Sequence, residues 1–178
     1  ARTKPDPGII ARLGLQPQNF FLYVGSRTKN KNLSVAIRAI ELLDRTNVPL
    51  VIVGGDNSKV FQDNSSDGAS GLLLAGRLTD SEIAALYAHA SAFVFPSLYE
   101  GFGVPPLEAM IFGCPVIAST AEAVVETCAD AAAYFDANDA EALKQLMLER
   151  LAIGAISDQE RRRQQDRVAF FSWPKPAK

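Results

Sequence analysis

The chain has 178 residues, a length that suits one domain with a full-sized core. Hydrophobic residues make up 48% of it and charged residues 21%, the balance of an ordinary soluble globular protein. The net charge of −2 excludes an overall basic field, so no nucleic-acid partner is expected. The chain has a single histidine, His89, and two cysteines, Cys114 and Cys128, without Cys-x-x-Cys spacing. A zinc site and a disulfide framework are therefore both unexpected.

The hydropathy pattern argues against membrane insertion. No apolar run approaches the roughly 20 residues that cross a bilayer, and the proline-rich start at 1–7 does not read as a signal peptide. We expect a cytoplasmic protein, and a peripheral position at the inner membrane face stays open for the full-length protein. The one charge cluster, Arg161-Arg162-Arg163, is expected to be a solvated helix face; a patch that contacts membrane or phosphate is the alternative.

Short apolar segments alternate with amphipathic ones along the chain. Apolar runs bounded by glycine, proline or polar residues predict buried strands at 20–24, 50–53, 71–75, 92–95, 116–118 and 132–135. Helical spacing and capping residues predict helices from Leu33 to before Asn47, and at 80–90, 105–112, 121–128, 140–152 and 158–170. The helix starts are assigned to Asn30 or Asn32, to Thr79 with Glu82 as a capping box, to Asn138 or Asp139, and to Ser157 or Asp158. Residues 56–70 are predicted to form a loop.

This alternation predicts an α/β fold, a Rossmann-like three-layer α/β/α sandwich with a parallel sheet of about six strands. We expect a single domain over 1–178, with 1–18 as a leader or linker, 19–156 as the core and 157–178 as a truncated C-terminal helix. Ligands of such folds bind beyond the carboxyl ends of the strands, so functional residues are expected in the loops that follow them.

The loop after the first predicted strand is rich in cations. Gly25 ends the strand, and Arg27, Lys29 and Lys31 precede the next helix. Arginine offers a planar fork to phosphate oxygens and lysine offers a point charge, so this loop is a candidate anion site. The alternative is an ordinary solvated basic loop.

The loop after the fourth predicted strand combines glycines with carboxylates. Gly101 and Gly103 leave room for a ligand to approach the backbone, and Glu100 and Glu108 flank the turn. Carboxylates accept hydrogen bonds in pairs, which suits the vicinal hydroxyls of a sugar or ribose, so we expect both to border one pocket. The alternative is a tight turn with a favourable acid in the first turn of the helix.

These segments together resemble a known family. The unit from Glu100 to Glu108, followed by Ala109-Met110-x-x-Gly113-x-Pro115-Val116, resembles the Glu-x7-Glu signature of retaining glycosyltransferases of family 4. Their GT-B fold consists of two Rossmann-like domains that face each other across a cleft. Three further segments resemble the C-terminal domain of that fold in the expected order: Tyr23–Arg27 with Lys31-Asn32-Leu33, the segment 76–82, and the run from Tyr87 to Ser97.

The resemblance implies a role for each matching residue. Glu100 would hold hydroxyls of the transferred sugar, and Glu108 would bind the ribose hydroxyls. Arg27 and Lys31 would neutralise the diphosphate leaving group. The remaining donor-binding residues are backbone positions: Gly25 and Ser26 in the cationic loop, Gly76, Arg77 and Leu78 facing the base, and Gly101, Phe102, Gly103 and Val104 at the sugar or diphosphate. No cofactor and no metal ion are expected, because the cations and helix amides would stabilise the leaving group.

The resemblance also implies a preceding acceptor-binding domain, which residues 1–15 cannot supply. We interpret the chain as the donor half of the enzyme, expected to bind nucleotide weakly and to transfer nothing alone. Its loop resembles that of mannosyltransferases that use GDP-mannose, and UDP-sugars are the alternative. The acceptor is expected to be a glycan or lipid-linked precursor. Two other readings compete with this one: a GT-B enzyme of another class, such as a nucleotide-sugar epimerase, which the Glu-x7-Glu unit disfavours, and a non-catalytic nucleotide- or partner-binding module.

Overall fold

The computed structural model describes residues 3–45, 47–55 and 71–171. The loop predicted at 56–70 and the end of the predicted C-terminal segment lie outside these residues. In the described part of the chain, no helix combines the length and apolar character needed to cross a membrane.

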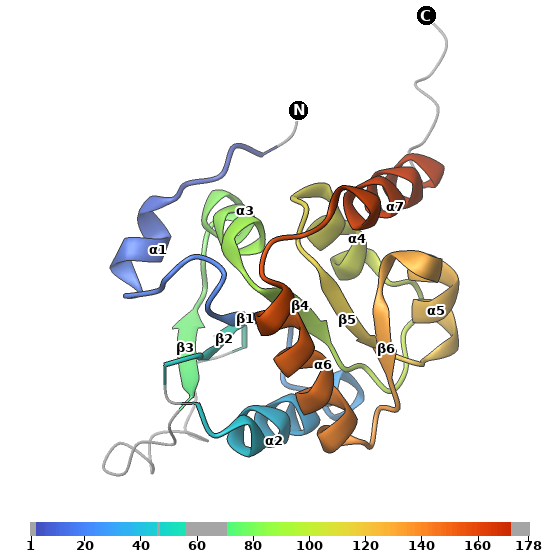
Figure 1. Cartoon of the computed structure of the whole chain (residues 1–178), viewed down its shortest axis with the longest axis horizontal. Coiled ribbons are helices and arrows are strands. Elements are labelled where there is room, and N and C mark those ends of the chain that lie inside the picture. Colours follow the sequence, from blue (N-terminus) through green and yellow to red (C-terminus); the bar gives the residue numbers. More distant parts are fainter. Residues whose placement is uncertain (1–2, 46, 56–70, 172–178) are drawn as a thin grey trace, which may run out of the picture.

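Six parallel strands form the central sheet, as the sequence predicted (Figure 1). They are β1 (Phe21–Val24), β2 (Leu50–Val53), β3 (Leu72–Gly76), β4 (Ala92–Phe95), β5 (Val116–Ser119) and β6 (Ala133–Phe135). The order in the sheet is β3-β2-β1-β4-β5-β6, and every neighbouring pair is parallel. This order reverses direction between β1 and β4, which makes their carboxyl ends the topological switch point of the sheet.

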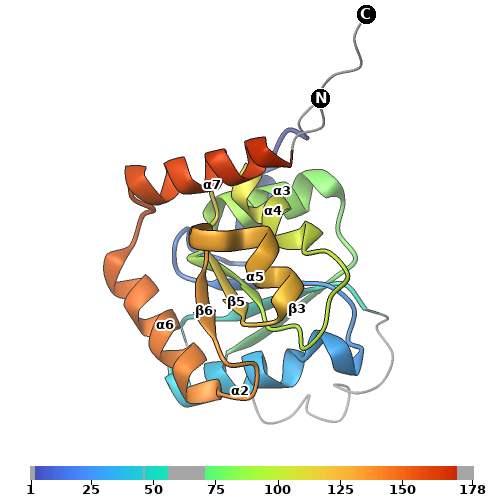
Figure 2. The same cartoon turned by 90° about the vertical axis from the view of Figure 1, so that its right-hand side faces the viewer.

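Helices cover both faces of the sheet (Figures 1 and 2). One face packs against α2 (Leu33–Leu43) and α6 (Ala140–Ile153), and the other against α3 (Asp80–His89), α4 (Val104–Ile111) and α5 (Glu122–Cys128). Successive strand residues belong to opposite cores, so Phe21 and Tyr23 meet α2 whereas Leu22 lies in the other core. The last helix, α7 (Asp158–Phe170), packs against α4.

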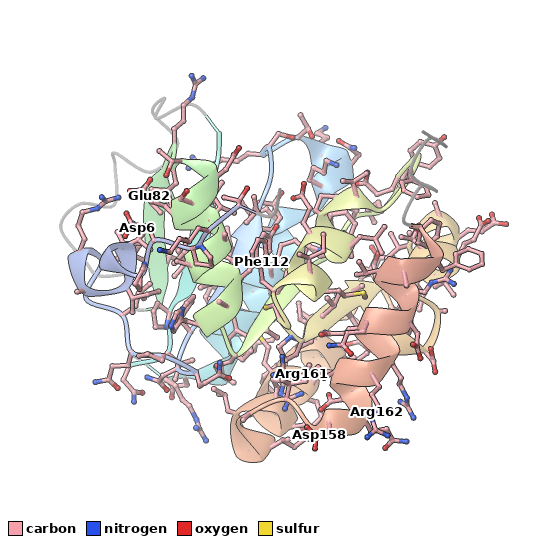
Figure 3. All side chains as sticks on the ribbon, turned by 90° about the horizontal axis from the view of Figure 1, so that it is seen from above. Asp6, Glu82, Phe112, Asp158, Arg161 and Arg162 are labelled. Atoms are coloured by element: carbon pink, nitrogen blue, oxygen red, sulfur yellow. The ribbon has the colours of Figure 1, made fainter. Side chains whose placement is uncertain are left out.

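The amino-terminal segment corrects the predicted domain boundary. Residues Gly8–Arg12 form a short helix, α1, that lies beside α3 (Figure 3). Ile9, Ile10 and Leu15 are buried in the same core as α3, and the N–H of Asp6 donates to the carbonyl oxygen of Ser81 at 2.9 Å. The core therefore begins before residue 19. Five helical residues are too few to show a hydrophobic period, which is why this element was not predicted.

Most predicted helix starts are confirmed by their caps. Thr79 and Ser157 both form complete capping boxes, with Glu82 and Glu160 respectively, and Asp139 caps α6. Asn32 occupies the cap position of α2, but its backbone is left-handed and its side chain does not cap the helix. That side chain has a different role, described below.

The Ser157–Glu160 capping box is tied to a buried arginine. Arg150 Nη1 donates to Glu160 Oε1 at 2.8 Å, and its Nη2 donates to the carbonyl oxygens of Gly154 and Ala155. Burial by itself would raise the pKa of Glu160, but the Ser157 N–H and the Arg150 charge outweigh it, so this pKa lies below its usual value. The carboxylate thus links the start of α7 to the end of α6 in its ionised form.

This lowered pKa predicts acid sensitivity. Because the folded-state pKa lies below the unfolded one, the ionised carboxylate stabilises the fold above the unfolded pKa. That contribution is lost as the pH falls through the folded pKa. We expect the free energy of unfolding, measured in urea, to decrease between about pH 5 and pH 3, and less steeply in Glu160→Gln. Glu122→Gln, which changes an exposed carboxylate, should keep the slope of the unmodified chain. Equal slopes in all three proteins would contradict the prediction.

Candidate donor-binding site

The predicted functional loops meet at the switch point of the sheet. The loop after β1 spans residues 25–32 and includes a 3-10 turn, Lys29–Lys31. The loop after β4 spans residues 96–103 and leads into α4. Because β1 and β4 are adjacent and parallel, both loops leave the sheet at the same edge and side by side. Open α/β sheets bind their ligands at this point of the strand order.

Tyr23 supports the cationic loop from below. Its hydroxyl donates to the carbonyl oxygen of Ser26 at 2.5 Å. Burial raises the pKa of Tyr23 to about 12, with the Glu100 carboxylate adding to the shift and Arg27 opposing it. The phenol is therefore neutral and remains a donor at ordinary pH.

Two asparagines join the cationic loop to its neighbours. Asn32 Nδ2 donates to the carbonyl oxygen of Pro96 at 3.0 Å and to that of Ala137 at 2.7 Å. The carbonyl oxygen of Asn30 accepts from the N–H of Leu98 at 2.8 Å. These bonds hold the loops after β1, β4 and β6 in one arrangement. Sequence reasoning missed this role of Asn32, because the positions of its acceptors depend on the strand order.

Lys31 and Glu100 form an ion pair between the two loops. Lys31 Nζ lies 2.5 Å from Glu100 Oε1 and 5.9 Å from the centre of the Phe95 ring. Ser97 Oγ donates to the same carboxylate oxygen at 2.7 Å, and Ser119 Oγ donates to the carbonyl oxygen of Ser97. The structure thus brings together two of the three residues predicted to be catalytic. Ser97 adds a positioning contact that sequence reasoning did not single out.

Arg27, the third of these residues, lies beside the turn that follows β2. A Cβ atom placed on Gly55 would lie 3.0 Å from Arg27 Nε, so the side chain passes directly over this glycine. Gly54 approaches the carbonyl oxygen of Gly25 closely, and its N–H donates to the carbonyl oxygen of Gly76 at 3.0 Å. The turns after β1, β2 and β3 are therefore packed together at this edge.

Glu108 lines a pocket formed by α3, α4 and the end of β1. The pocket, of about 390 Å³, lies between α3 and α4 and includes Val24 at the end of β1. Partial burial and the nearby Asp80 carboxylate raise the pKa of Glu108. Tyr87, buried and stacked on Phe112, also lines this pocket. Glu100 is not among the residues that line this pocket; it pairs with Lys31 between the loops after β1 and β4.

The glycine-rich turn offers fewer free amides than expected. The N–H of Val104 donates to the carbonyl oxygen of Phe102 at 2.9 Å, and the next two residues of α4 are prolines, which have no N–H. A Cβ on Gly101 would meet nothing within 4 Å, whereas one on Gly103 would contact Thr127. The half-exposed Phe102 ring contacts Phe171 edge to face, with centroids 5.3 Å apart. Within the turn 101–104, the backbone N–H groups that could bind a ligand are therefore those of residues 101–103.

The segment predicted to face the base follows β3, at the same edge of the sheet. Gly76 ends the strand with a φ of +68°. Arg77 is exposed, and Leu78 packs against the core that contains α3. This segment leads into Thr79 and Asp80, so it adjoins the Glu108 pocket.

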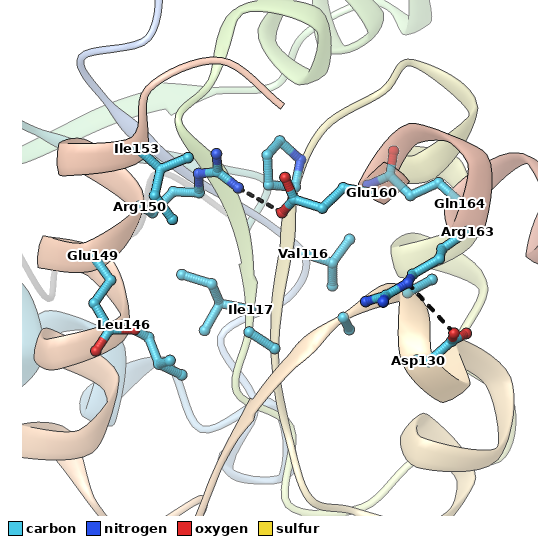
Figure 4. Close-up of a pocket in the computed structure, with 14 residues that line it drawn as sticks. Val116, Ile117, Asp130, Leu146, Glu149, Arg150, Ile153, Glu160, Arg163 and Gln164 are labelled. Atoms are coloured by element: carbon cyan, nitrogen blue, oxygen red, sulfur yellow. Dashed lines mark hydrogen bonds and ion pairs between the residues drawn. The ribbon is translucent and has the colours of Figure 1, made fainter. Parts of the chain in front are cut away.

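A second pocket, of about 230 Å³, lies at the opposite ends of β5 and β6, between α6 and α7 (Figure 4). Arg150 pairs with Glu160 across its wall, and Arg163 pairs with Asp130 at 3.6 Å. Arg161 and Arg162 lie on different sides of α7 (Figure 3), and Arg161 reaches over Gly113. The three exposed arginines therefore do not gather into one patch, and this pocket lies at the opposite edge of the sheet from the loops after β1 and β4.

The fold and its loops define a Rossmann-like α/β domain that presents a cationic loop, an ion-paired carboxylate and a carboxylate-lined pocket at one sheet edge. Residues 9–168 match the family described as glycosyl transferases, group 1, and the chain belongs to this family of enzymes. The predicted resemblance is thereby confirmed.

Individual relatives agree with this membership. The chain is 31% identical over 172 residues to O-antigen chain mannosyltransferase B of Escherichia coli, covering 93% of this chain and 45% of that protein. Sucrose-phosphate synthase of Thermosynechococcus elongatus superposes with a TM-score of 0.74 at 27% identity, over 96% of this chain and 46% of that one. The C-terminal domain of a group 1 glycosyl transferase from Francisella tularensis has the same fold, with a TM-score of 0.69 at 20% identity, covering 94% and 92% of the two chains. The chain thus spans about half the length of the first two relatives.

Proposed function

We propose that this chain is the donor-binding domain of a retaining glycosyltransferase that takes a hexose from a nucleoside diphosphate sugar. The observation that carries the proposal is the Lys31–Glu100 ion pair at the switch point of the sheet. It joins a cation suited to phosphate with a carboxylate suited to sugar hydroxyls. The acceptor is proposed to be a glycan or lipid-linked precursor, bound by a part of the enzyme beyond this chain.

Each residue of the site has a proposed task. Lys31 and Arg27 bind the diphosphate, and Glu100 accepts hydrogen bonds from the sugar. Glu108 accepts them from the ribose, in the pocket beside the segment 76–78 that faces the base. The cationic loop is held by Tyr23 and Asn32 before any ligand arrives, so its charges need little reorganisation during the reaction.

These tasks define an electrostatic mechanism. Breaking the bond between sugar and phosphate places negative charge on the departing diphosphate and positive character on the sugar ring. The two cations stabilise the diphosphate, while Glu100 keeps the sugar oriented for attack from the same face, which retains its configuration. We propose that no metal ion is required, since Arg27 and Lys31 supply the positive charge.

GDP-mannose is the proposed donor. Its support is the similarity to an O-antigen chain mannosyltransferase over most of this chain. The chain is also similar to a sucrose-phosphate synthase, which is not a mannosyltransferase. UDP-sugars are therefore the second candidate donors to test.

A thermal-shift screen against GDP, UDP and their sugars tests the proposal. A ligand at about 100 times its dissociation constant stabilises the fold by about 2.7 kcal/mol, or about 5–10 °C for a domain of this size. We expect such a shift with GDP-mannose, a smaller one with UDP-sugars, and no change when EDTA is added.

Two variants give the screen its controls. Glu108→Gln should reduce the shift produced by every nucleotide, whereas Glu122→Gln, at an exposed position on α5, should leave it unchanged. Absence of any shift with all nucleotides and nucleotide sugars would refute the proposed function. A larger shift with a UDP-sugar would refute only the choice of donor.

A further inference from the structure

Lys31 and Glu100 form an ion pair with each other when no ligand is present. Their side chains are 24% and 10% exposed, so the pair is well shielded from water. Such shielding strengthens the attraction between the two charges relative to a pair in bulk solvent. Any anion that binds Lys31 must therefore compete with a carboxylate that is already in place.

The two carboxylate oxygens of Glu100 differ in how many hydrogen bonds they accept. Lys31 Nζ and Ser97 Oγ both bind Oε1. Among the residues that the structure describes, none donates a hydrogen bond to Oε2, and this atom is not buried out of contact with solvent. Oε2 is therefore an acceptor open to a ligand, while Oε1 is held by the protein.

We propose that this ion pair makes the site select a nucleotide sugar over the nucleoside diphosphate that remains after transfer. The inference rests on the proposed function and adds a preference between its substrate and its product. A nucleoside diphosphate places its negative charge at Lys31 and next to Glu100. It weakens the existing ion pair and is repelled by the carboxylate, and it brings no donor for Oε2.

The Glu100 carboxylate has a different effect on the binding of a nucleotide sugar. Its diphosphate is equally disfavoured by Glu100, but its sugar hydroxyls donate to Oε2 in charge-assisted hydrogen bonds. The carboxylate is thus an attractive contact for the substrate and mainly a repulsive one for the product. Selectivity built in this way combines an added contact with an added penalty, and it favours release of the product.

Isothermal titration of GDP and GDP-mannose into Glu100→Gln tests this inference. Glutamine keeps the size of the side chain and removes its charge, so Lys31 is free to bind phosphate. We expect GDP to bind about tenfold more tightly than to the unmodified chain, and GDP-mannose to bind no more tightly or more weakly. The ratio of the two dissociation constants should therefore shift by about tenfold or more towards GDP. If the screen selects UDP, the same titration uses UDP and UDP-glucose.

Ser97→Ala and Glu122→Gln are the matched variants. Ser97→Ala removes a neutral donor and keeps the carboxylate, so it should change GDP affinity much less than Glu100→Gln does. Glu122→Gln removes an equal charge at an exposed position on α5, outside the Lys31–Glu100 ion pair, and should change neither affinity. Thermal unfolding of each variant without ligand verifies that it is folded.

The possible outcomes separate the two proposals. Failure of the unmodified chain to bind any nucleotide would refute the proposed function and this inference with it. Binding by the unmodified chain with an unchanged ratio in Glu100→Gln, or weaker GDP binding in that variant, would overturn the inference alone. A similar gain in GDP affinity in Glu122→Gln would also overturn it, because the effect would then reflect net charge.

Discussion

Replacing Lys31 by methionine is expected to weaken the binding of nucleoside diphosphates by about 100-fold. Methionine keeps an unbranched stem beside Phe95 and removes the charge. The loss has two sources: the diphosphate loses a cation, and Glu100 then faces it without the partner that offset its charge. Isothermal titration measures the effect, which is opposite in sign to that of Glu100→Gln.

Lys29→Met is the matched control for this prediction. Lys29 lies in the same 3-10 turn and carries the same charge, but its side chain is exposed. We expect its replacement to weaken binding by no more than about threefold, because an exposed charge is screened by solvent. Equal losses in the two variants would show that the loop acts through its total charge, which would contradict a specific role for Lys31.

Replacing Gly54 by alanine is expected to lower the free energy of unfolding by about 3 kcal/mol or more. Gly54 has a φ of +99°, and an added Cβ would lie 2.7 Å from the carbonyl oxygen of Gly25. The strain is in the backbone dihedral and the clash is with a main-chain oxygen, so no side-chain rotation relieves either of them. Urea unfolding followed by circular dichroism measures the change.

Gly101→Ala provides the comparison. Nothing lies within 4 Å of a Cβ at this position, and its φ is outside the left-handed region. We expect its stability to stay within about 0.5 kcal/mol of the unmodified chain. If Gly54→Ala were as stable as Gly101→Ala, the result would contradict the close approach of the turns after β1 and β2.

Features that depend on neighbouring residues were predictable from the sequence. The strand Leu50–Val53 was predicted with the bounds observed, because a short apolar run ending in glycines has few other conformations open to it. The capping boxes at Thr79 and Ser157 were predictable for the same reason, since both partners lie within one helical turn.

Features that depend on distant contacts were not predictable in this way. Helix α1 is stabilised by burial of Ile9 and Ile10 in a core formed mainly by residues much later in the chain. The Asn32 side chain bonds to carbonyl groups 64 and 105 residues further along, although its local pattern indicates an N-cap. For α1 the local pattern was too short to predict a helix, and for Asn32 the local pattern predicted an N-cap instead of a contact between loops.

The fold class, and the edge of the sheet at which the functional loops lie, were predictable from the sequence, because alternating apolar strands and amphipathic helices favour a parallel sheet whose ligand-binding loops follow the carboxyl ends of its strands. Which charged groups meet depends on the order of the strands in the sheet. Lys31 and Glu100 are 69 residues apart and pair because β1 and β4 are neighbours in the sheet. Glu108, on α4, lines a pocket together with residues of α3, and Glu100 is not among the residues of that pocket. Strand order follows from how the whole core packs, and no local pattern of residues specifies it.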